Sequence, residues 1–372
     1  MSPMITRAPA PASETRRRHQ QIAVQEQLRG FFDSRTAIAR SYGPSFTRLW
    51  TLAERSVAGG KLVRPMLMLD MLDALSRPDD AFDGCHGETP IEIAAAIELL
   101  HVAFLMHDDV IDGDLTRRGC ANLVGALLDE TGAAGERTQA DLHWARTGGI
   151  LMGDLLLTGV HQIFARARLP HERRLQLLDL LDHAVMESVA GEDLDVGLSA
   201  GVIEPELATI LSMSSCKTAA YTFQLPLRIA AALAGAGADV DTAVSTAGRH
   251  LGLAFQLQDD LLSMFGDPRQ HGKDPLSDLR EGKQTAIISY ARRTDAWPVI
   301  EAFFGRTDVT AADGAAVRDH LIDCGAKTFV EDLIDEQLSA CRTMADGTAA
   351  DLPAPARQVL LDLVARLDGR RS

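Results

Sequence analysis

The sequence predicts an all-α protein, and three features of the chain support that fold class. Apolar residues recur at helical spacing along most of its 372 residues. Glycine and proline fall between these stretches, where helices are expected to end. No convincing run of alternating apolar and polar residues predicts a strand. With 46% hydrophobic residues the chain can fill a large core, so we expect one helical domain over residues 19–372.

The N-terminal region predicts a tail followed by short helices. Residues 1–18 lack an apolar run, so we expect a disordered tail and no signal peptide, although the Arg and Ala content also resembles a transit peptide. Helices are expected over 19–42, 46–57 and 66–76. A polar loop is expected over 77–88.

The rest of the chain continues the helical pattern. Stretch 128–145 is polar and Gly-rich, which predicts a surface excursion, and Gly149 and Gly153 then suggest close helix packing. Glu192, Asp193 and Asp195 are acidic and are expected to lie in a solvated loop, with a further acidic site as the alternative. Further helices are expected over 89–112, 147–168, 172–190, 204–220, 225–234, 240–265 and, as shorter amphipathic segments, beyond residue 285.

The segment Thr89–Gly119 is the centre of the chemistry. Thr89 is a suitable N-cap, Pro90 suits the first helical position, and Glu92 completes a capping box. The apolar run that follows is long, but acidic and histidine side chains interrupt it. We therefore expect a core helix and no transmembrane segment.

This helix ends in an acidic cluster. Asp108 and Asp112 are four residues apart and share one face, and Asp109 flanks them. Like charges at the electronegative end of a helix repel, unless a cation is bound. Oxygen ligands favour Mg²⁺, and Arg117 with Arg118 suits a diphosphate. The alternative is an acidic helix end in contact with solvent.

Two further segments carry charge in glycine-rich or apolar surroundings. In GGKLVRP, Gly59 and Gly60 allow close backbone approach, and Lys61 and Arg64 can point to one side of a helix, although both could be ordinary surface residues. Lys217 lies in an apolar context and needs a counter-charge or a ligand, unless its side chain reaches solvent.

A second apolar helix ends like the first. Asp259 and Asp260 close the 240–265 stretch, and Gln256 precedes them by three residues. Two acidic helix ends could together hold a metal cluster.

Composition excludes several classes of protein. A net charge of −15 argues against a nucleic-acid partner, since phosphate backbones require basic surfaces. The five cysteines form no CxxC pair, which argues against a zinc site or a disulfide framework. These features favour the reducing cytosol, so the expected location is cytoplasmic.

A series of motifs occurs in order from Gly59 to Thr285: GGKxxRP, ExxHxxxxxxDDxxDxxxxRRG, KT, FQxQDD, GK and GKQT. Together these motifs resemble those of the trans-isoprenyl diphosphate synthases, the polyprenyl synthetase family. The resemblance implies a bundle of antiparallel helices around a deep central cavity, usually in a homodimer. It also implies Mg²⁺-dependent condensation of isopentenyl diphosphate with an allylic diphosphate (dimethylallyl, geranyl or farnesyl).

The resemblance also implies residue roles. Three Mg²⁺ ions would be bound by Asp108, Asp109, Asp112, Asp259 and Asp260. The allylic diphosphate would be contacted by Arg117, Lys217 and Lys273, and isopentenyl diphosphate by Lys61, Arg64, His101 and Arg118. Thr218 and Gln256 would line the site of the allylic cation, and Phe255 and Lys283 would join the substrate-binding set.

Two positions bear on the length of the product. Bulk at Ala103 and Phe104 limits chain length in this family, and one small and one aromatic residue there resemble a geranylgeranyl diphosphate synthase. A farnesyl or longer product is the alternative, and another helix could set the limit.

Ser263 stands where the second aspartate-rich motif commonly has aspartate, which bears on activity. The rival readings are a non-catalytic partner subunit and a class I terpene cyclase.

Overall fold

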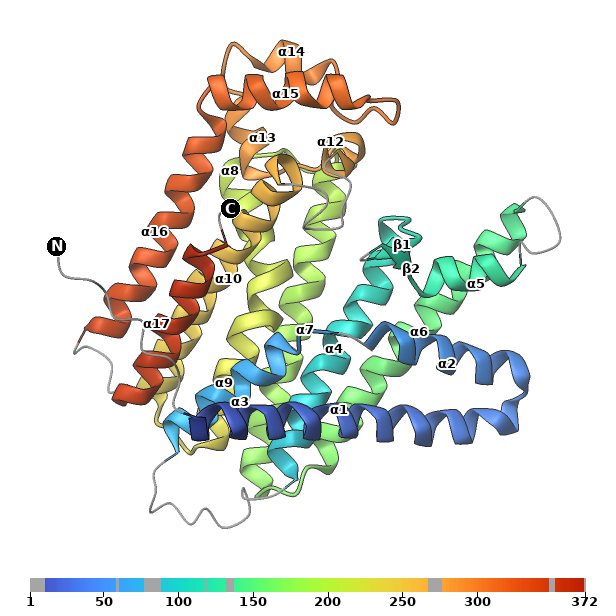
Figure 1. Cartoon of the computed structure of the whole chain (residues 1–372), viewed down its shortest axis with the longest axis vertical. Coiled ribbons are helices and arrows are strands. Elements are labelled where there is room, and N and C mark those ends of the chain that lie inside the picture. The colour runs from blue at the N-terminus through green and yellow to red at the C-terminus, as the bar shows by residue number, and fades with distance from the viewer. Residues whose placement is uncertain are drawn as a thin grey trace. The chain divides into compact units, whose positions relative to one another are not determined.

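Helices form almost all of the computed structural model (Figure 1). Residue contacts divide the chain into two units, the first covering Met1–Asp73, Arg77–Leu115 and Asn122–Arg174, and the second the remainder. The all-α prediction is confirmed, whereas the single domain from residue 19 stays a prediction. The structure describes residues 11–57, 60–76, 88–117, 119–131, 137–266, 276–347 and 352–370.

The first unit is built around α4, whose side chains are buried along most of its length. Its elements are α1 (Pro11–Ala39), a 3₁₀ turn (Arg40–Tyr42), α2 (Pro44–Val57), most of α3 (Val63–Leu75), α4 (Thr89–Ile111), α5 (Leu123–Thr131), α6 (Gln139–Arg166) and the start of α7 (His171–Ser199).

Small residues let α6 approach α4 closely, as the sequence suggested. A Cβ atom added to Gly153 would lie 2.3 Å from His107 Nε2, and one added to Gly149 would lie 2.6 Å from Val110 Cγ2. Glycine at both positions therefore brings α6 against the end of α4 that carries the acidic cluster.

Helix α1 begins earlier than expected, so the predicted tail is wrong for residues 11–18. Arg16 pairs with Asp73 of α3, Gln20 donates to the same carboxylate at 3.0 Å, and Arg17 lies 3.2 Å from Asp70. These contacts with α3 stabilise a polar helix start that has no apolar face of its own.

Two other helix starts differ from the prediction. Helix α6 begins at Gln139 and not near Thr147, because Thr138 and Asp141 form a capping box within the expected excursion. The N-cap of α4 is Glu88, without a side-chain cap bond, so the predicted Thr89 capping box is wrong and Thr89 is the first helical residue. Helix α5 continues to Thr131, which shortens the excursion further.

The second unit is organised around α10 (Ala238–Phe265), which packs against a π-helix (Ser215–Gln224), α16 and α17. The π-helix lies between α8 and α9 and carries Lys217 and Thr218. The unit also holds the rest of α7, a short antiparallel pair (β1 Thr116–Arg117, β2 Cys120–Ala121), α8 (Leu207–Ser214), α9 (Leu225–Leu233), α12 (Ser277–Glu281), α13 (Ala286–Ala291), α14 (Trp297–Glu301), α15 (Ala311–Asp323), α16 (Ala326–Asp346) and α17 (Ala354–Asp368).

Glycines also set the packing of α10 against the π-helix. A Cβ atom on Gly252 would lie 2.3 Å from Ala219 Cβ, and one on Gly248 would lie 2.9 Å from Gln224 Cα. Within the described residues, therefore, the backbone of α10 approaches the irregular helix closely just before its acidic end.

Helices α4 and α6 are long and apolar enough to cross a membrane by length and composition. The apolar window of α4 is 72% buried within the protein, which is typical of a core helix, whereas that of α6 is 39% buried. These two helices are therefore weak evidence for a membrane span.

Candidate active site

The first acidic cluster lies at the C-terminal end of α4. Asp112 caps the helix, and its backbone N–H donates to the Asp108 carbonyl at 2.8 Å, so the two side chains are one turn apart. Both are partly buried, whereas Asp109 is only 4% exposed. Asp108 and Asp112 thus form the accessible pair of carboxylates, and Asp109 lies inside the protein.

His107 is held at the base of this cluster by two groups of α6. Its Nε2 atom lies 3.3 Å from an Asp154 carboxylate oxygen and 3.3 Å from the Ile150 carbonyl. This contact depends on Gly153, since any side chain there would overlap the imidazole ring. The contact between His107 and Asp154 was not predicted from the sequence, although Gly153 beside Asp154 was the available signal.

Asn122 braces the loop that follows the cluster. It is 7% exposed, its amide donates to the Asp114 carbonyl at 2.8 Å, and its carbonyl oxygen accepts from the Gly125 backbone N–H at 2.8 Å. The same residue therefore caps α5 and fixes the chain after α4. In the paired strands Arg117 lies opposite Cys120, and Arg118 lies outside the described residues.

The GGKLVRP segment enters α3 through an unusual backbone conformation. Leu62 has φ 49°, in the left-handed region, and its side chain is 2% exposed. A Cβ atom on Gly60 would lie 3.2 Å from Glu98 Oε1, so this backbone runs directly over a buried carboxyl group of α4. Lys61 is exposed and Arg64 is partly buried on either side of Leu62, while Gly59 lies outside the described residues.

The remaining candidates on α4 divide by burial. Ala103 is completely buried, whereas His101 and Phe104 are each partly buried. Phe104 and His101 thus keep part of their surface exposed, whereas Ala103 is packed inside the protein.

In the second unit a chain of hydrogen bonds links the π-helix to α10. The Thr218 hydroxyl donates to Gln256 Oε1 at 2.6 Å, and the Gln256 amide donates to Asp260 Oδ1 at 2.9 Å. The structure therefore brings together three of the predicted site residues. The π-helix fits this arrangement, since such irregular turns are frequent at functional sites.

Asp260 is an unusual carboxylate. Enclosure of its carboxyl group raises its pKa to about 7, and repulsion from Asp278 and Asp259 adds to the rise, against the hydrogen bond from Gln256 and the attraction of Lys283. Asp260, Asp278 and Lys283 line one narrow pocket, and Lys283 also lies 3.3 Å from Glu281.

The donor set of these clusters fits a divalent cation. It consists of carboxylate oxygens, which Mg²⁺ prefers, and Asp278 and Asp259 add negative charge beside the enclosed Asp260 carboxyl group. Ser263 is 8% exposed and its hydroxyl is enclosed, so the position where the motif departs from aspartate lies inside the protein.

Lys217 has counter-charges within the second unit. Its ammonium group lies 2.8 Å from Glu192 and 2.6 Å from Asp195, both on α7. The expected solvated loop over 192–195 is wrong, because α7 continues through these residues to Ser199. Gly191 permits the contact, since a Cβ atom there would lie 2.2 Å from the Lys217 backbone nitrogen.

Asp259 and Phe255, the other candidates on α10, contact Arg370 near the end of the chain. The Arg370 Nη2 atom donates to Asp259 Oδ1 at 2.6 Å, and its guanidinium lies over the Phe255 ring. Lys273 lies outside the described residues.

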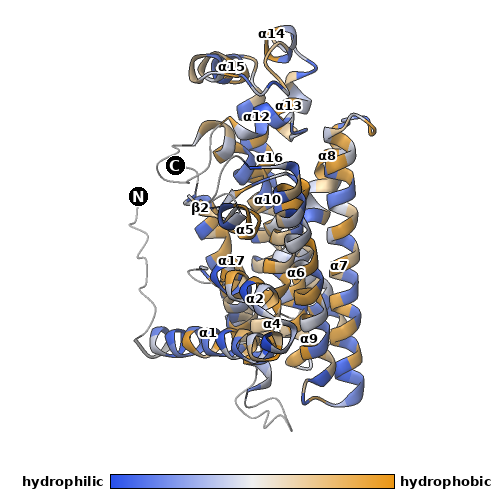
Figure 2. Ribbon diagram, turned by 90° about the vertical axis from the view of Figure 1, so that its right-hand side faces the viewer, coloured by the Kyte–Doolittle hydropathy of each residue, from blue (hydrophilic) through white to orange (hydrophobic). Residues whose placement is uncertain are grey.

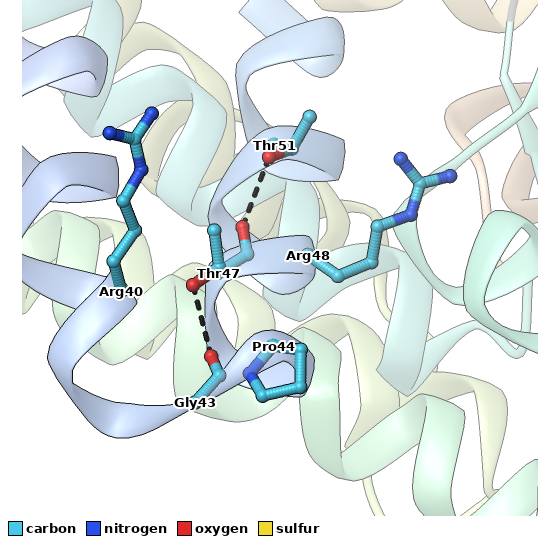
Figure 3. Close-up of a pocket in the computed structure, with 6 residues that line it drawn as sticks. All are labelled: Arg40, Gly43, Pro44, Thr47, Arg48 and Thr51. Atoms are coloured by element: carbon cyan, nitrogen blue, oxygen red, sulfur yellow. Dashed lines mark hydrogen bonds between the residues drawn. The ribbon is translucent and has the colours of Figure 1, made fainter.

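A separate surface pocket holds none of the predicted residues. It lies at the turn between α1 and α2, and Figure 3 shows its side chains, among them Arg40 and Arg48. Hydrogen bonds from Thr47 to the Gly43 carbonyl at 2.9 Å and from Thr51 to the Thr47 carbonyl at 3.0 Å stay within the helix turn. These bonds indicate a structural role.

Acidic helix ends in both units and an all-α fold fit a class of enzyme that acts on diphosphates with a divalent metal. The polyprenyl synthetase family model matches residues 47–317, and the chain belongs to that family. It is accordingly a prenyl diphosphate synthase, a transferase of isoprenoid biosynthesis with the isoprenoid synthase fold.

Relatives and solved structures agree with this assignment. The chain is 32% identical to a geranylfarnesyl diphosphate synthase of Aeropyrum pernix over 74% of this chain and 79% of the relative. It is 30% identical to a geranylgeranyl diphosphate synthase of Methanosarcina mazei, covering 74% and 76%. A crystal structure of a geranylgeranyl pyrophosphate synthase from Corynebacterium glutamicum, complexed with isoprenyl diphosphate and magnesium, has TM-score 0.86 and 28% identity, covering 95% of this chain and 98% of that one.

Proposed function

We propose that this enzyme condenses isopentenyl diphosphate with dimethylallyl, geranyl or farnesyl diphosphate and releases mainly geranylgeranyl diphosphate. The observation that carries the proposal is the chain of hydrogen bonds Thr218–Gln256–Asp260. It joins a hydroxyl, an amide and a carboxyl group whose pKa is raised. The geranylgeranyl and geranylfarnesyl synthases among the relatives support a short-chain product.

Mg²⁺, three ions by the resemblance to the family, would be held by the carboxylates of both acidic clusters. The ligands would be Asp108, Asp109, Asp112, Asp259 and Asp260. Bound there, the metal supplies charge neutralisation for a departing diphosphate. The all-oxygen donor set supports this choice of metal.

Basic side chains would bind the two substrates. Arg117, Lys217 and Lys273 would contact the allylic diphosphate, with Glu192 and Asp195 holding the Lys217 ammonium group in place beforehand. Lys61, Arg64, His101 and Arg118 would bind isopentenyl diphosphate, and Lys283 would add positive charge beside Asp260. The buried Leu62 supports a fixed geometry for Lys61 and Arg64.

Neutral groups of the second unit would stabilise the allylic cation that forms when the C–O bond breaks. The Thr218 hydroxyl donates to Gln256, so its oxygen lone pairs face away from that bond and can point toward positive charge. Phe255 adds an aromatic face of the kind that stabilises cations. Positioning of this cation against the isopentenyl double bond would account for much of the rate.

Chain length would depend on the two residues one turn before Asp108. Ala103 is fully buried and leaves Phe104 as the bulky group at this depth of α4. One aromatic side chain would allow a longer product than two would. This supports geranylgeranyl diphosphate over farnesyl diphosphate.

We further propose that the enzyme is a cytoplasmic homodimer. Exposed apolar side chains on α7 support a subunit interface: Met186 is 66%, Val189 56% and Val196 44% exposed, and they recur at helical spacing. Figure 2 shows hydrophobic residues along this long helix.

The experiment uses the purified full-length chain alone with Mg²⁺, isopentenyl diphosphate and each allylic primer in turn. Chromatography should detect geranylgeranyl diphosphate as the main product. Activity that requires a second protein would indicate a partner subunit, and terpene hydrocarbons would indicate a cyclase. Either result would contradict the proposal.

A further inference from the structure

Arg370 makes two contacts with the second acidic cluster. Its Nη2 atom lies 2.6 Å from Asp259 Oδ1, and its guanidinium carbon lies 4.2 Å from the centre of the Phe255 ring. Phe255 and Asp259 are four residues apart on α10, so one planar cation covers a full turn of this helix.

The end of α17 delivers Arg370 to this place. The buried Gln258 amide of α10 donates to the Leu367 carbonyl at 2.8 Å, and Arg342 of α16 pairs with Asp368. Gly369 then caps the helix, with its N–H bonded to the Ala365 carbonyl at 3.1 Å, and Arg370 follows directly. The position of the guanidinium therefore follows from contacts on both sides of α17.

The charges explain why a cation belongs there. Asp259 and Asp260 are adjacent carboxylates near the end of α10, and the charge of each opposes ionisation of the other. A guanidinium beside Asp259 relieves part of this repulsion while no divalent ion is bound. The ion pair is about one-third exposed on each side, at 34% and 36%, so it is weak enough to be exchanged.

We propose that Arg370 is the internal counter-cation of the second aspartate cluster and competes with Mg²⁺ for Asp259. The inference rests on the proposed function, because that function makes Asp259 a metal ligand. Arg370 acts through Asp259 and Phe255 and is a positioning residue. Before metal binding it holds both side chains in place, and metal binding requires that Asp259 Oδ1 be released from the guanidinium.

The test is calorimetric titration of MgCl₂ into the full-length protein at low salt. Arg370→Ala should bind Mg²⁺ more tightly than the natural protein, by roughly two- to tenfold, the range for a partly exposed ion pair with a cation–π contact. Arg370→Lys should lie between, because lysine keeps the charge but loses the planar stacking. Arg366→Ala is the matched control, since Arg366 is exposed on the same helix.

The outcomes separate the inference from the proposed function. The control requires that Arg366→Ala bind Mg²⁺ as tightly as the natural protein. If Arg370→Ala then binds Mg²⁺ no more tightly than the natural protein, the inference alone is overturned. Loss of measurable binding in the natural protein would overturn the metal role of Asp259 and the inference with it. Thermal unfolding of each variant shows whether it is folded, and Arg370→Gln, which keeps a polar side chain without charge, replaces the alanine variant if that one unfolds.

Discussion

Asp260 shows at the scale of one residue how the fold changes the chemistry of a proposed metal ligand. Its carboxyl group is enclosed and lies near two other carboxylates, which raises its pKa to about 7. The unfolded chain would ionise it near the ordinary value of 3.8. The folded protein therefore takes up a proton at this site over the intervening pH range, and a bound cation would remove the need for it.

This shift predicts the direction of a pH effect. Because the folded pKa lies above the unfolded one, Asp260 should favour folding below about pH 4 and lose that contribution as the pH rises to about 7. Thermal unfolding in a chelator should therefore show a slope over this range that Asp260→Asn reduces. An unchanged slope in the variant would contradict the shifted pKa.

Asp259 and Ser263 should differ sharply in their effect on turnover. Asp259 is partly exposed and is the proposed ligand, whereas Ser263 is enclosed at 8% exposure. Asp259→Ala should lower the rate by roughly a hundredfold or more, as expected for loss of a charge-stabilising group. Ser263→Ala should have a small effect. Steady-state kinetics checks both, and equal, large losses would contradict the assignment.

Phe104 should limit the product. Removing its ring reduces the side-chain volume one turn before Asp108, where Ala103 is already small. Phe104→Ala should therefore shift the main product to a longer chain, measured by chromatography of the reaction products. The same product distribution as the natural enzyme would move the limit to another helix.

At the scale of elements, the contact between α4 and α6 depends on glycine. The side chain at residue 153 would meet the His107 ring at 2.3 Å and push it from Asp154. Gly153→Ala should destabilise the protein by about 1–3 kcal/mol through overpacking. Urea unfolding measures this change.

Gly30 provides the control for that prediction. It lies inside α1 with no atom within 4 Å of an added Cβ, so Gly30→Ala should raise stability, by about 0.5–1 kcal/mol. A destabilising Gly30→Ala, or a neutral Gly153→Ala, would show that packing between α4 and α6 is looser than these distances indicate.

Elements with a continuous apolar pattern could be predicted from the sequence, and those stabilised by polar contacts could not. The ends of α4 and α10 were found because apolar spacing and the flanking glycine or proline residues agree there, although the cap predicted at Thr89 is wrong. The start of α1 was missed because its stability comes from Asp70 and Asp73, distant in sequence. The acidic part of α7 was missed because Glu192 and Asp195 need Lys217 to be explained.

The candidate site residues also divide into those that the sequence pattern predicts and those that only contacts explain. Residue types and spacing predicted the aspartate clusters as metal ligands, and the structure joins Thr218, Gln256 and Asp260 in one chain of hydrogen bonds. Supporting groups such as His107, Asn122 and Arg370 carry no motif of their own. His107 contacts a residue 43 positions away in sequence, and Arg370 contacts one 111 positions away. Asn122 instead braces the loop that precedes it.

At the scale of the whole molecule, the family sets the reaction, and we propose that a few side chains set the product. Relatives at 30–32% identity carry the names of synthases with different chain lengths. The common chemistry therefore has to lie in what these proteins share, and the carboxylates with their basic partners are suited to it. The product would then follow from bulk along α4.

A crystal structure of this chain with Mg²⁺ and inorganic pyrophosphate tests that claim most directly. We expect metal density bonded to Asp108 and Asp112 and to Asp259 and Asp260, with the pyrophosphate oxygens on the same ions. Density showing the pyrophosphate elsewhere and these carboxylates without metal, turned to solvent, would contradict it.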